Sequence, residues 1–397
     1  MEHYNPIFSK VPTLRFAEFT DEWEKYELSH FVTRITRRNK NNKSSLPLTI
    51  SAQYGLVDQI SFFNKTVASV DLSGYYLLYN GDFAYNKSYS NDYAWGAVKR
   101  LDKYEKGCLS SLYFVFRPND NVDSDYLTHY FESSKWHKGI SNIAGEGARN
   151  HGLLNMSVDD YFATKHCLPS LPEQKKIARF FNAITRRIEI QNKIISKYET
   201  LIKGICFRLL SKIEEYPTVK LSEILTEYCD KTSKNNEFPI LSSTMSGIYV
   251  QSEYFNKQAA CEENVGYKKI PYGYCTYRSM SDTGEFRFNI QKTVQMGIVS
   301  PAYPVFTSTI YDIDFVAFYL NKSTRLRKQI IEAKEGGTRF ALSFSKLSNL
   351  TIPKIAKQQQ TKMIEIYHAF LRKEDIERDY LNKLREQKSY LLSKMFI

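Results

Sequence analysis

Two loops of this sequence bring basic, amide and aromatic side chains together at close spacing. They are NKSYSNDYAWGAVKR (86–100) and YRSMSDTGEFR (277–287). Lysine and arginine bind phosphate, amides hydrogen-bond to base edges, and tyrosine rings stack on bases. The pattern therefore indicates contact with a nucleic acid, with an ordinary solvated loop as the alternative at each position. The candidate residues in these loops are Asn86, Lys87, Ser88, Tyr89, Asn91, Tyr93, Tyr277, Arg278, Ser279 and Arg287.

Further candidates lie in other loops of both halves of the chain. One group comprises Gln53, Tyr54, Thr244 and Met245. Arg149 and Arg339 follow glycines at equivalent places, where a basic side chain suits phosphate binding. Lys87-Ser88 aligns with Arg278-Ser279 at a shift of 191, which places one basic residue of each pair in each half.

The overall charge favours a polyanion as partner. Lysine and arginine number 55 against 43 acidic residues, a formal net charge of +12. A surplus of this size suggests nucleic acid, and a merely basic protein is the alternative. For Arg34, Arg37 and Arg38 a phosphate contact and a solvated face are both open. The 29 tyrosines and 25 phenylalanines fit core and strand positions better than a wholly base-stacking role.

Catalytic motifs are missing from the sequence. It contains no GxxxxGK[ST] phosphate loop, no HExxH, no GxSxG and no Asn-Pro-Pro-aromatic motif. The seven histidines show no metal-ligand spacing, and the six cysteines form no CxxC pair. We therefore expect no catalytic residue, no metal site, and buried free thiols in a reducing cytoplasm. No 18-residue apolar run and no signal-peptide core occur, so we expect no membrane span.

One long helix is predicted to position the candidate loops of the first half. LPSLPEQKKIARFFNAITRRIEIQNKIISKYETLIKGICFRLL (168–210) begins with Ser170, Pro172 and Glu173, which fit a capping box and a first-turn proline. Roughly 38 helical residues make a rod on the order of 57 Å long. Its apolar stripe, a heptad-like seam, consists of Ile177, Phe181, Ile184, Ile188, Ile195, Tyr198, Ile202, Ile205 and Leu209. Such a seam requires a partner helix.

The second half of the sequence repeats the first and supplies that partner. Residues 47–65 match 239–257 at a shift of 192, and 107–116 match 297–306 at a shift of 190. GEGARN matches EGGTRF, and LPSLPEQ matches IPKIAKQ at a shift of 184. The chain then ends in a second long helix, whose seam residues are Phe370, Leu381, Leu384, Leu391 and Met395. Four matches in the same order indicate a duplication.

The predicted fold class is α+β. Two mixed α/β globular units are joined and separated by two long α-helices packed as an antiparallel coiled coil. The expected segments are 1–168, with an N-terminal lead-in and the first unit, 169–215 for the first helix, 216–353 for the second unit and 354–397 for the second helix.

The arrangement resembles the specificity (S) subunit of type I restriction-modification systems. LPSLPEQKKIARFFNAITRRI (168–188), with its Pro-Glu-Gln motif, carries the strongest resemblance. NGDFAYNKS (80–88), the WEKYELSHFVTRI opening and the GARN and GTRF segments are also similar to that family. In the second helix Ala356-Lys357 replaces Pro-Glu, which puts the start of that helix in question.

The resemblance implies a non-catalytic DNA-recognition subunit with two target recognition domains. Each would read one half of an asymmetric bipartite site in double-stranded DNA. The helices would set the gap and dock two modification (methyltransferase) subunits, with restriction (translocase and endonuclease) subunits in the full complex. S-adenosylmethionine, ATP and Mg are then expected on those partners, with no cofactor in this chain, in a bacterial or archaeal cytoplasm. The alternative is a non-catalytic protein-binding scaffold whose helices space two duplicated interaction domains.

Overall fold

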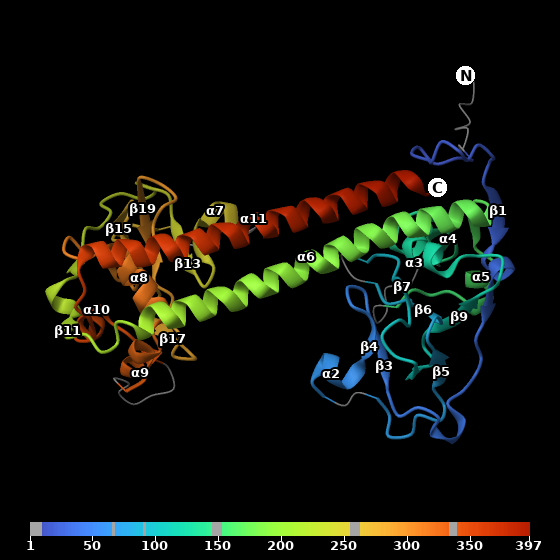
Figure 1. Cartoon of the computed structure of the whole chain (residues 1–397), viewed down its shortest axis with the longest axis horizontal. Coiled ribbons are helices and arrows are strands. Elements are labelled where there is room, and N and C mark those ends of the chain that lie inside the picture. Colours follow the sequence, from blue (N-terminus) through green and yellow to red (C-terminus); the bar gives the residue numbers. More distant parts are fainter. Residues whose placement is uncertain (1–9, 66–67, 90–92, 145–152, 255–262, 333–339) are drawn as a thin grey trace. The chain divides into compact units, whose positions relative to one another are not determined.

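The computed structural model describes residues 10–65, 68–89, 93–144, 153–254, 263–332 and 340–397 (Figure 1). The chain forms two compact units. The first unit is Met1–Asn192 together with Asp379–Ile397, and the second is Lys193–Arg378. Each unit holds strand-rich structure and one part of each long helix. The segment boundaries expected from the sequence, with the helices as separate spacers, stay predictions.

The first unit is built around a four-stranded antiparallel sheet of order β2-β9-β6-β7. Three two-stranded sheets accompany it: β1-β10, β3-β4 and β5-β8. Its elements are β1 (Glu24–Glu27), α1 (Leu28–Phe31), β2 (Val32–Arg34), η1 (Lys40–Asn42), β3 (Leu48–Ser51), β4 (Gly55–Asp58), α2 (Gln59–Phe63), β5 (Tyr76–Tyr79), β6 (Phe83–Asn86), β7 (Ala97–Arg100), β8 (Lys106–Leu109), β9 (Phe114–Pro118), α3 (Ser124–Glu132), α4 (His137–Ile143), α5 (Val158–Phe162) and β10 (Lys165–Leu168).

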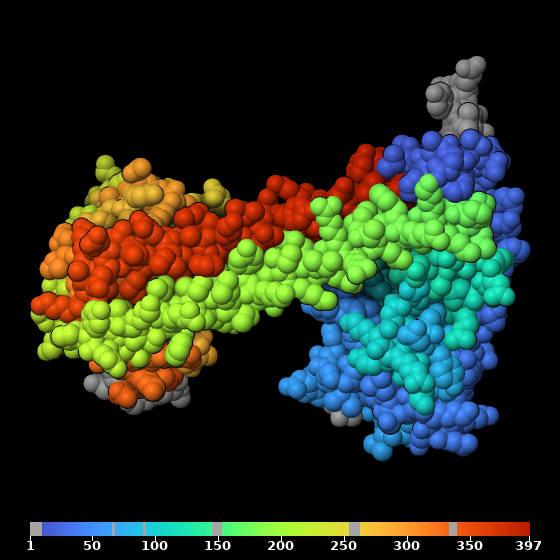
Figure 2. Space-filling view, in the orientation of Figure 1, coloured from blue at the N-terminus to red at the C-terminus, as the bar shows by residue number. Residues whose placement is uncertain are grey.

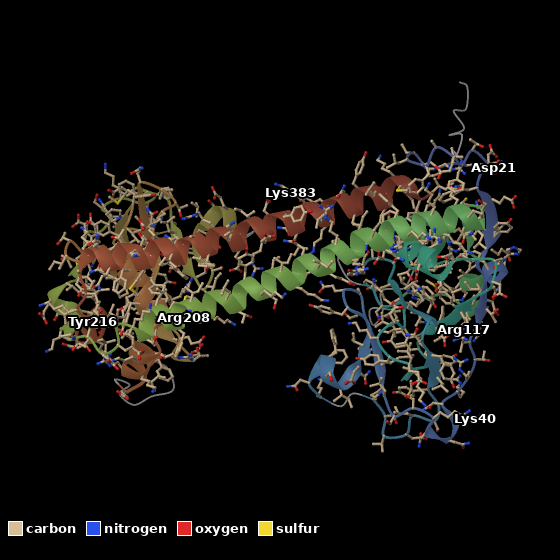
Figure 3. The ribbon with its side chains drawn as sticks, in the orientation of Figure 1. Asp21, Lys40, Arg117, Arg208, Tyr216 and Lys383 are labelled. Carbon is tan, nitrogen blue, oxygen red and sulfur yellow. The ribbon has the colours of Figure 1, made fainter. Side chains whose placement is uncertain are left out.

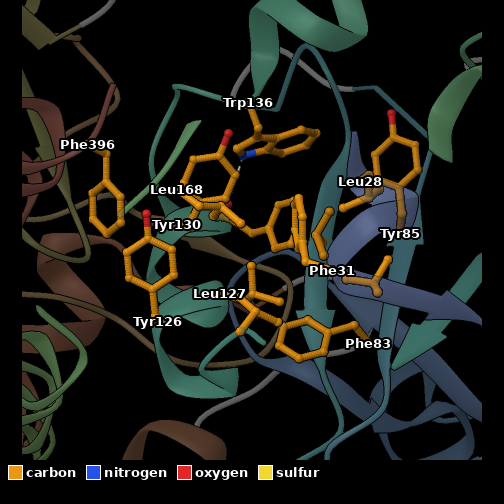
Figure 4. Close-up of a cluster of buried hydrophobic side chains, with 14 of the residues drawn as sticks. Leu28, Phe31, Phe83, Tyr85, Tyr126, Leu127, Tyr130, Trp136, Leu168 and Phe396 are labelled. Carbon is orange, nitrogen blue, oxygen red and sulfur yellow. Dashed lines mark hydrogen bonds between the residues drawn. The ribbon is translucent and has the colours of Figure 1, made fainter. Parts of the chain in front are cut away.

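Aromatic side chains fill the core of the first unit. Figure 4 shows Phe31, Phe83, Tyr85 and Tyr130 among the buried side chains of this cluster. The ring of Tyr85 stacks on that of Tyr161 with centroids 4.7 Å apart, and the Tyr85 hydroxyl donates to the Trp95 carbonyl at 2.9 Å. Burial raises the pKa of Tyr85. Many of the tyrosines that the sequence offers for base stacking are therefore core residues.

The second unit repeats this order of elements. Its four-stranded sheet has the order β12-β20-β16-β18, which matches β2-β9-β6-β7 strand for strand. The elements are β11 (Thr218–Lys220), η2 (Leu221–Glu223), β12 (Thr226–Glu227), β13 (Leu241–Thr244), β14 (Gly247–Val250), α7 (Gln251–Tyr254), β15 (Lys268–Pro271), β16 (Cys275–Thr276), β17 (Met280–Ser281), β18 (Asn289–Ile290), β19 (Met296–Val299), β20 (Val305–Thr307), α8 (Ile313–Lys322), α9 (Thr324–Glu332), β21 (Phe340–Ala341), α10 (Phe344–Ser348) and β22 (Thr351–Pro353). The predicted α+β class is confirmed.

Both predicted long helices are present, as α6 (Leu171–Ser211) and α11 (Lys357–Met395). In the first unit the Phe181 ring lies 5.7 Å from that of Phe396, and Lys388 Nζ donates to Thr185 Oγ1 at 2.9 Å. Residue numbers rise along α6 as they fall along α11, so the helices are antiparallel there. The helices are also antiparallel in the second unit. There Arg378 forms an ion pair with Glu199, and Cys206 and Ile364 belong to the same core cluster.

The seam residues are buried to different degrees. Ile177, Phe181, Ile195, Ile202, Leu381, Leu384, Leu391 and Met395 are buried, whereas Ile184, Ile188, Tyr198, Ile205, Leu209 and Phe370 are half-buried. Near the end of α6 the more deeply buried side chains are Cys206 and Leu210, each one residue beyond the expected position. A straight helix has 3.6 residues per turn, so it drifts away from a 3.5-residue repeat. These two residues also face the core of the second unit.

A buried glutamine ties the start of α6 to the first unit, and another ties the start of α11 to the second unit. The Gln174 side-chain oxygen accepts from the Asp123 N–H at 2.9 Å, and its amide nitrogen donates to the Pro169 carbonyl at 2.9 Å. Asp123 is the N-cap of α3, so one amide side chain links the start of α6 to the start of α3.

Gln360 makes the same two contacts in the second unit. Its oxygen accepts from the N–H of Asp312, the N-cap of α8, at 2.8 Å, and its nitrogen donates to the Ile355 carbonyl at 3.0 Å. The equivalent of Gln174 is therefore Gln360, at a shift of 186. The shift of 184 drawn from the sequence, which chose Gln358, is wrong by two residues.

The predicted capping role of Glu173 is replaced by an ion pair. The buried Glu173 carboxylate accepts from Arg15 Nε at 2.7 Å and from Arg15 Nη2 at 2.8 Å. The lead-in segment is thereby held against the first turn of α6. Two charged hydrogen bonds offset the cost of burying this carboxylate.

Two further expectations from the sequence concern buried cysteine thiols and the absence of a membrane span. Cys108, Cys206 and Cys275 are buried free thiols, as expected, but Cys229 is exposed, and Cys261 lies outside the described residues. Within the described part of the chain, no helix is long and apolar enough to cross a membrane.

Replacing Gln360 by alanine should destabilise the second unit by about 1–3 kcal/mol, because the change leaves the Asp312 N–H and the Ile355 carbonyl without their partner. Urea unfolding of the full-length chain, followed by circular dichroism, measures the loss. Gln359→Ala is the matched control: Gln359 is exposed, so its replacement should change stability by no more than about 0.5 kcal/mol. Equal effects of the two substitutions would contradict the assigned role of Gln360.

Candidate nucleic-acid interface

The end of strand β6 carries the first candidate residue out of the core. Side chains alternate between the two faces of a strand, so Ala84 and Asn86 share one face and Tyr85 occupies the other. Ala84 is fully buried and packs with Leu48 and Leu56 of the β3-β4 hairpin. Asn86 is the next side chain on that face and is only half-buried. Its Oδ1 accepts the Ser88 N–H at 2.9 Å.

A cleft of about 1040 Å³ lies beside this region, within the first unit (Figure 2). Three residues predicted from the sequence line it: Gln53 and Tyr54 from the tip of the β3-β4 hairpin, and Tyr93. The basic side chains of the same cleft, which the sequence pattern did not indicate, are Lys99, Lys103 and Arg385. Arg385 belongs to α11, so no local sequence pattern connects it with this site.

Burial and neighbouring charges shift the pKa values of two groups in the cleft, Glu132 and Lys99. Burial raises the pKa of Glu132, but a hydrogen bond from His129 and the charge of Lys388 outweigh that effect and lower its pKa to about 2. Lys388 Nζ lies 2.8 Å from the Glu132 carboxylate, which is therefore neutralised within the protein. Burial lowers the pKa of Lys99, and Glu132 partly opposes that change. Lys103 and Arg385 are exposed and can face an anion.

Aromatic rings stand exposed next to the hairpin tip. Tyr54 is 61% exposed, and Phe62 and Phe63 of α2 are 44% and 45% exposed. The Tyr54 and Phe62 rings lie 6.4 Å apart, and those of Phe62 and Phe63 lie 5.0 Å apart. Exposed rings of this kind can stack on bases. No local sequence pattern marks these two phenylalanines as exposed, because Tyr161 and Phe162 are likewise neighbours on a five-residue helix and both are buried.

The other candidates of loop 86–100 have mixed surroundings. The Lys87 ammonium lies 5.3 Å from the centroid of the Phe114 ring, and its side chain is half-buried. Ser88 is exposed and forms an isolated bridge with Leu153, and Tyr89 is 38% exposed. Asn91, Arg149 and Arg339 lie outside the described residues.

In the second unit the candidates gather around a cavity of about 360 Å³. Thr244 and Met245 line it from the tip of the β13-β14 hairpin, and Arg278 and Arg287 line it from the sheet side. Met245 is 63% exposed. Arg278 is exposed and makes no ion pair with any described residue, and the buried Arg287 Nε has no hydrogen-bond partner among them. Ser279, half-buried, accepts the Leu342 N–H through its carbonyl.

Tyr277 is a core residue, and its choice as a DNA contact is wrong. It is fully buried, and its hydroxyl donates to the Leu342 carbonyl at 3.1 Å. Strand pairing explains the error, because Phe83 pairs with Phe116 and Cys275 pairs with Phe306. That register makes Tyr277 the equivalent of Tyr85, at a shift of 192.

The same register corrects the pairing of Lys87 with Arg278. At a shift of 192 the equivalent of Arg278 is Asn86, and that of Lys87 is Ser279. A one-residue slip moves every side chain to the other face of a strand, so the correction changes which residues occupy equivalent positions.

The arginines in and just after β2 divide into paired and exposed groups. Arg37 Nη2 and Arg117 Nε lie 2.7 and 2.6 Å from the carboxylate of the fully buried Asp82 (Figure 3 labels Arg117). Asp82 is the acidic residue of NGDFAYNKS, so this motif is structural at that position. Arg38 covers the Tyr76 ring at 4.2 Å and donates to the Gly74 carbonyl. Arg34 is exposed.

Comparisons with known proteins bear on the fold. No family model matches the sequence. A chain from a structure on complex assembly and conformational transition of the type I R-M system aligns over 96% of this chain and 98% of its own, with a TM-score of 0.59 and 15% identity. The type I restriction-modification system S subunit from M. genitalium aligns over 98% and 99%, with a TM-score of 0.53 and 15% identity. At this identity the likeness shows the fold, so the expected resemblance is confirmed at the level of fold.

Proposed function

We propose that the chain is the DNA sequence-specificity subunit of a type I restriction-modification assembly. Each unit reads one half of an asymmetric bipartite target in double-stranded DNA. The observation that carries the proposal is the duplicated geometry. In both units a hairpin tip (Gln53 and Tyr54, or Thr244 and Met245) and the chain that leads into the strand beside the central strand (Ala97, or Arg287) border a recess lined in part by basic side chains. The shared fold with S subunits supports it.

The chemistry of the assembly belongs to partner subunits. In this proposal modification subunits bring S-adenosylmethionine, and restriction subunits bring ATP and Mg, while this chain is non-catalytic. The outer faces of the long helices suit protein docking. Arg208 of α6 and Lys383 of α11 extend into solvent (Figure 3), and Phe207 and Ile376 are 72% and 64% exposed. Exposed apolar residues on a charged helix are typical of a protein interface.

The long helices act as the spacer between the two readers. At about 1.5 Å per residue, the 41 residues of α6 correspond to a rod of roughly 61 Å. Because Gln174 and Gln360 tie the helix starts to their units, helix length is transmitted to the DNA-reading surfaces. The proposal therefore links the gap in the DNA target to the number of helical turns.

DNA binding by the purified full-length chain, alone or with modification subunits, should weaken steeply with salt, since phosphate contacts release counterions. Binding isotherms at several salt concentrations give the slope. Lys103→Ala and Arg385→Ala should each reduce it by about 1 if the side chain contacts phosphate. Lys10→Ala is the matched control, because Lys10 is exposed and paired with Glu22. Salt-independent binding, or no DNA binding, would instead favour the protein-binding scaffold.

Lengthening both helices by one heptad should widen the gap in the recognised site by about 10 Å, or roughly three base pairs. The insertions follow Gln191 in α6 and Lys383 in α11, so that the antiparallel seam stays in register. Sequencing of methylated DNA from cells with the complete system reports both half-sites and the gap. Unchanged half-sites with a longer gap support the spacer role, whereas an unchanged gap refutes it.

A further inference from the structure

We infer that the position after the buried strand tyrosine is a base-reading position in both units: Asn86 selects adenine in one half-site, and Arg278 selects guanine in the other. This inference rests on the proposed function, and it adds the identity of one base pair in each half of the target. It is carried by the register of the strands, the direction of the side chains and the hydrogen-bonding groups left without a partner.

The equivalence of Asn86 and Arg278 follows from strand pairing on both sides of the central strand. β6 pairs with β7 and β9, and β16 pairs with β18 and β20, all antiparallel. Phe83 faces Arg100 and Phe116, whereas Cys275 faces Ile290 and Phe306. These partners differ by a constant 190 and the central residues by 192, so position 86 corresponds to position 278.

Both side chains leave the sheet on the face that the hairpin covers. Ala84 and Thr276 are fully buried on that face, and Asn86 and Arg278 are the next side chains along it. Tyr85 and Tyr277, the residues between them, are held in the core by hydrogen bonds from their hydroxyls to backbone carbonyls. The two tyrosines therefore fix the direction in which the reading side chains point.

The two side chains have free hydrogen-bonding capacity. Among the described residues, Arg278 has no hydrogen-bond or ion-pair partner, in contrast to Arg327, which is paired with Glu285. Within the same part of the chain Asn86 uses only Oδ1, which accepts the Ser88 N–H and retains a second lone pair. Its Nδ2 group has no assigned acceptor there. An asparagine in this state can accept one hydrogen bond and donate another to a single base.

The chemistry of the two groups differs in a defined way. An asparagine amide fits N6 and N7 of adenine, and a guanidinium fits O6 and N7 of guanine, each through two hydrogen bonds in the major groove. The neighbouring strand reinforces the difference. Asn86 pairs with Ala97, whose equivalent at a shift of 190 is Arg287, and Arg287 lines the same cavity as Arg278. The first unit thus offers an amide beside a methyl group, and the second offers two guanidinium groups.

The test exchanges the two side chains in the complete system and reads the methylated motif by sequencing. The wild-type motif should contain an A·T pair that Asn86→Arg changes to G·C, and a G·C pair in the other half that Arg278→Asn changes to A·T. Each exchange should alter the preference at that one position by roughly 5- to 150-fold. Asn121→Arg and Arg327→Asn are the matched controls, because they make the same exchanges at exposed positions outside the two recesses, and both should leave the motif unchanged.

Alanine variants keep the test decisive if an exchanged chain no longer supports methylation. Binding of Asn86→Ala and Arg278→Ala complexes is measured on duplexes that carry each of the four base pairs at every position of one half-site. Loss of preference at a single A·T pair and a single G·C pair, respectively, supports the inference. An unchanged preference overturns it and leaves the proposed function intact. Absence of any bipartite motif for the wild-type system would instead overturn the proposed function itself.

Discussion

The buried amide at the start of each long helix is the contact on which the rest of the arrangement depends. Gln174 and Gln360 each join the first turn of a long helix to the N-cap of the helix that follows the central sheet. Both amide groups are satisfied at both ends, so they rigidify the junction without leaving a buried polar atom unpaired. A helix that is fixed at its start can transmit its length to a recognition surface, whereas a hinged one cannot.

The second constraint is the register of very short strands. β16 has only two residues, yet its pairing with two neighbours decides that Tyr277 is buried and that Arg278 reaches the cavity. The same frame exists in the first unit around Tyr85 and Asn86. Both units thus share a scaffold of buried tyrosine and paired strands, while the residue that follows the tyrosine is an amide in one unit and a guanidinium in the other.

Sequence reasoning predicted the features that depend on long periodic patterns. The start of α6, the second helix, the repeat and most seam positions follow from 3.6-residue periodicity and from matches over many residues. The sequence misleads where one or two residues matter: the loop pattern indicates a DNA contact at Tyr277, which is buried, and the repeat pattern indicates Gln358 in place of Gln360. Short strands and a helix start without Pro-Glu are set by hydrogen bonds between distant residues, and no local pattern records these. The pairing of Arg37 with Asp82 and the presence of Arg385 in the cleft were missed for the same reason.

The central claim is that each unit reads its own half of one DNA target. Exchanging residues 217–353 for the corresponding segment of an S subunit with a known target, followed by sequencing of methylated DNA from cells with the complete system, tests it most directly. The account predicts that one half-site takes the sequence read by the donor, while the other half-site stays as in the wild type. A change in both half-sites, or in neither, would contradict it.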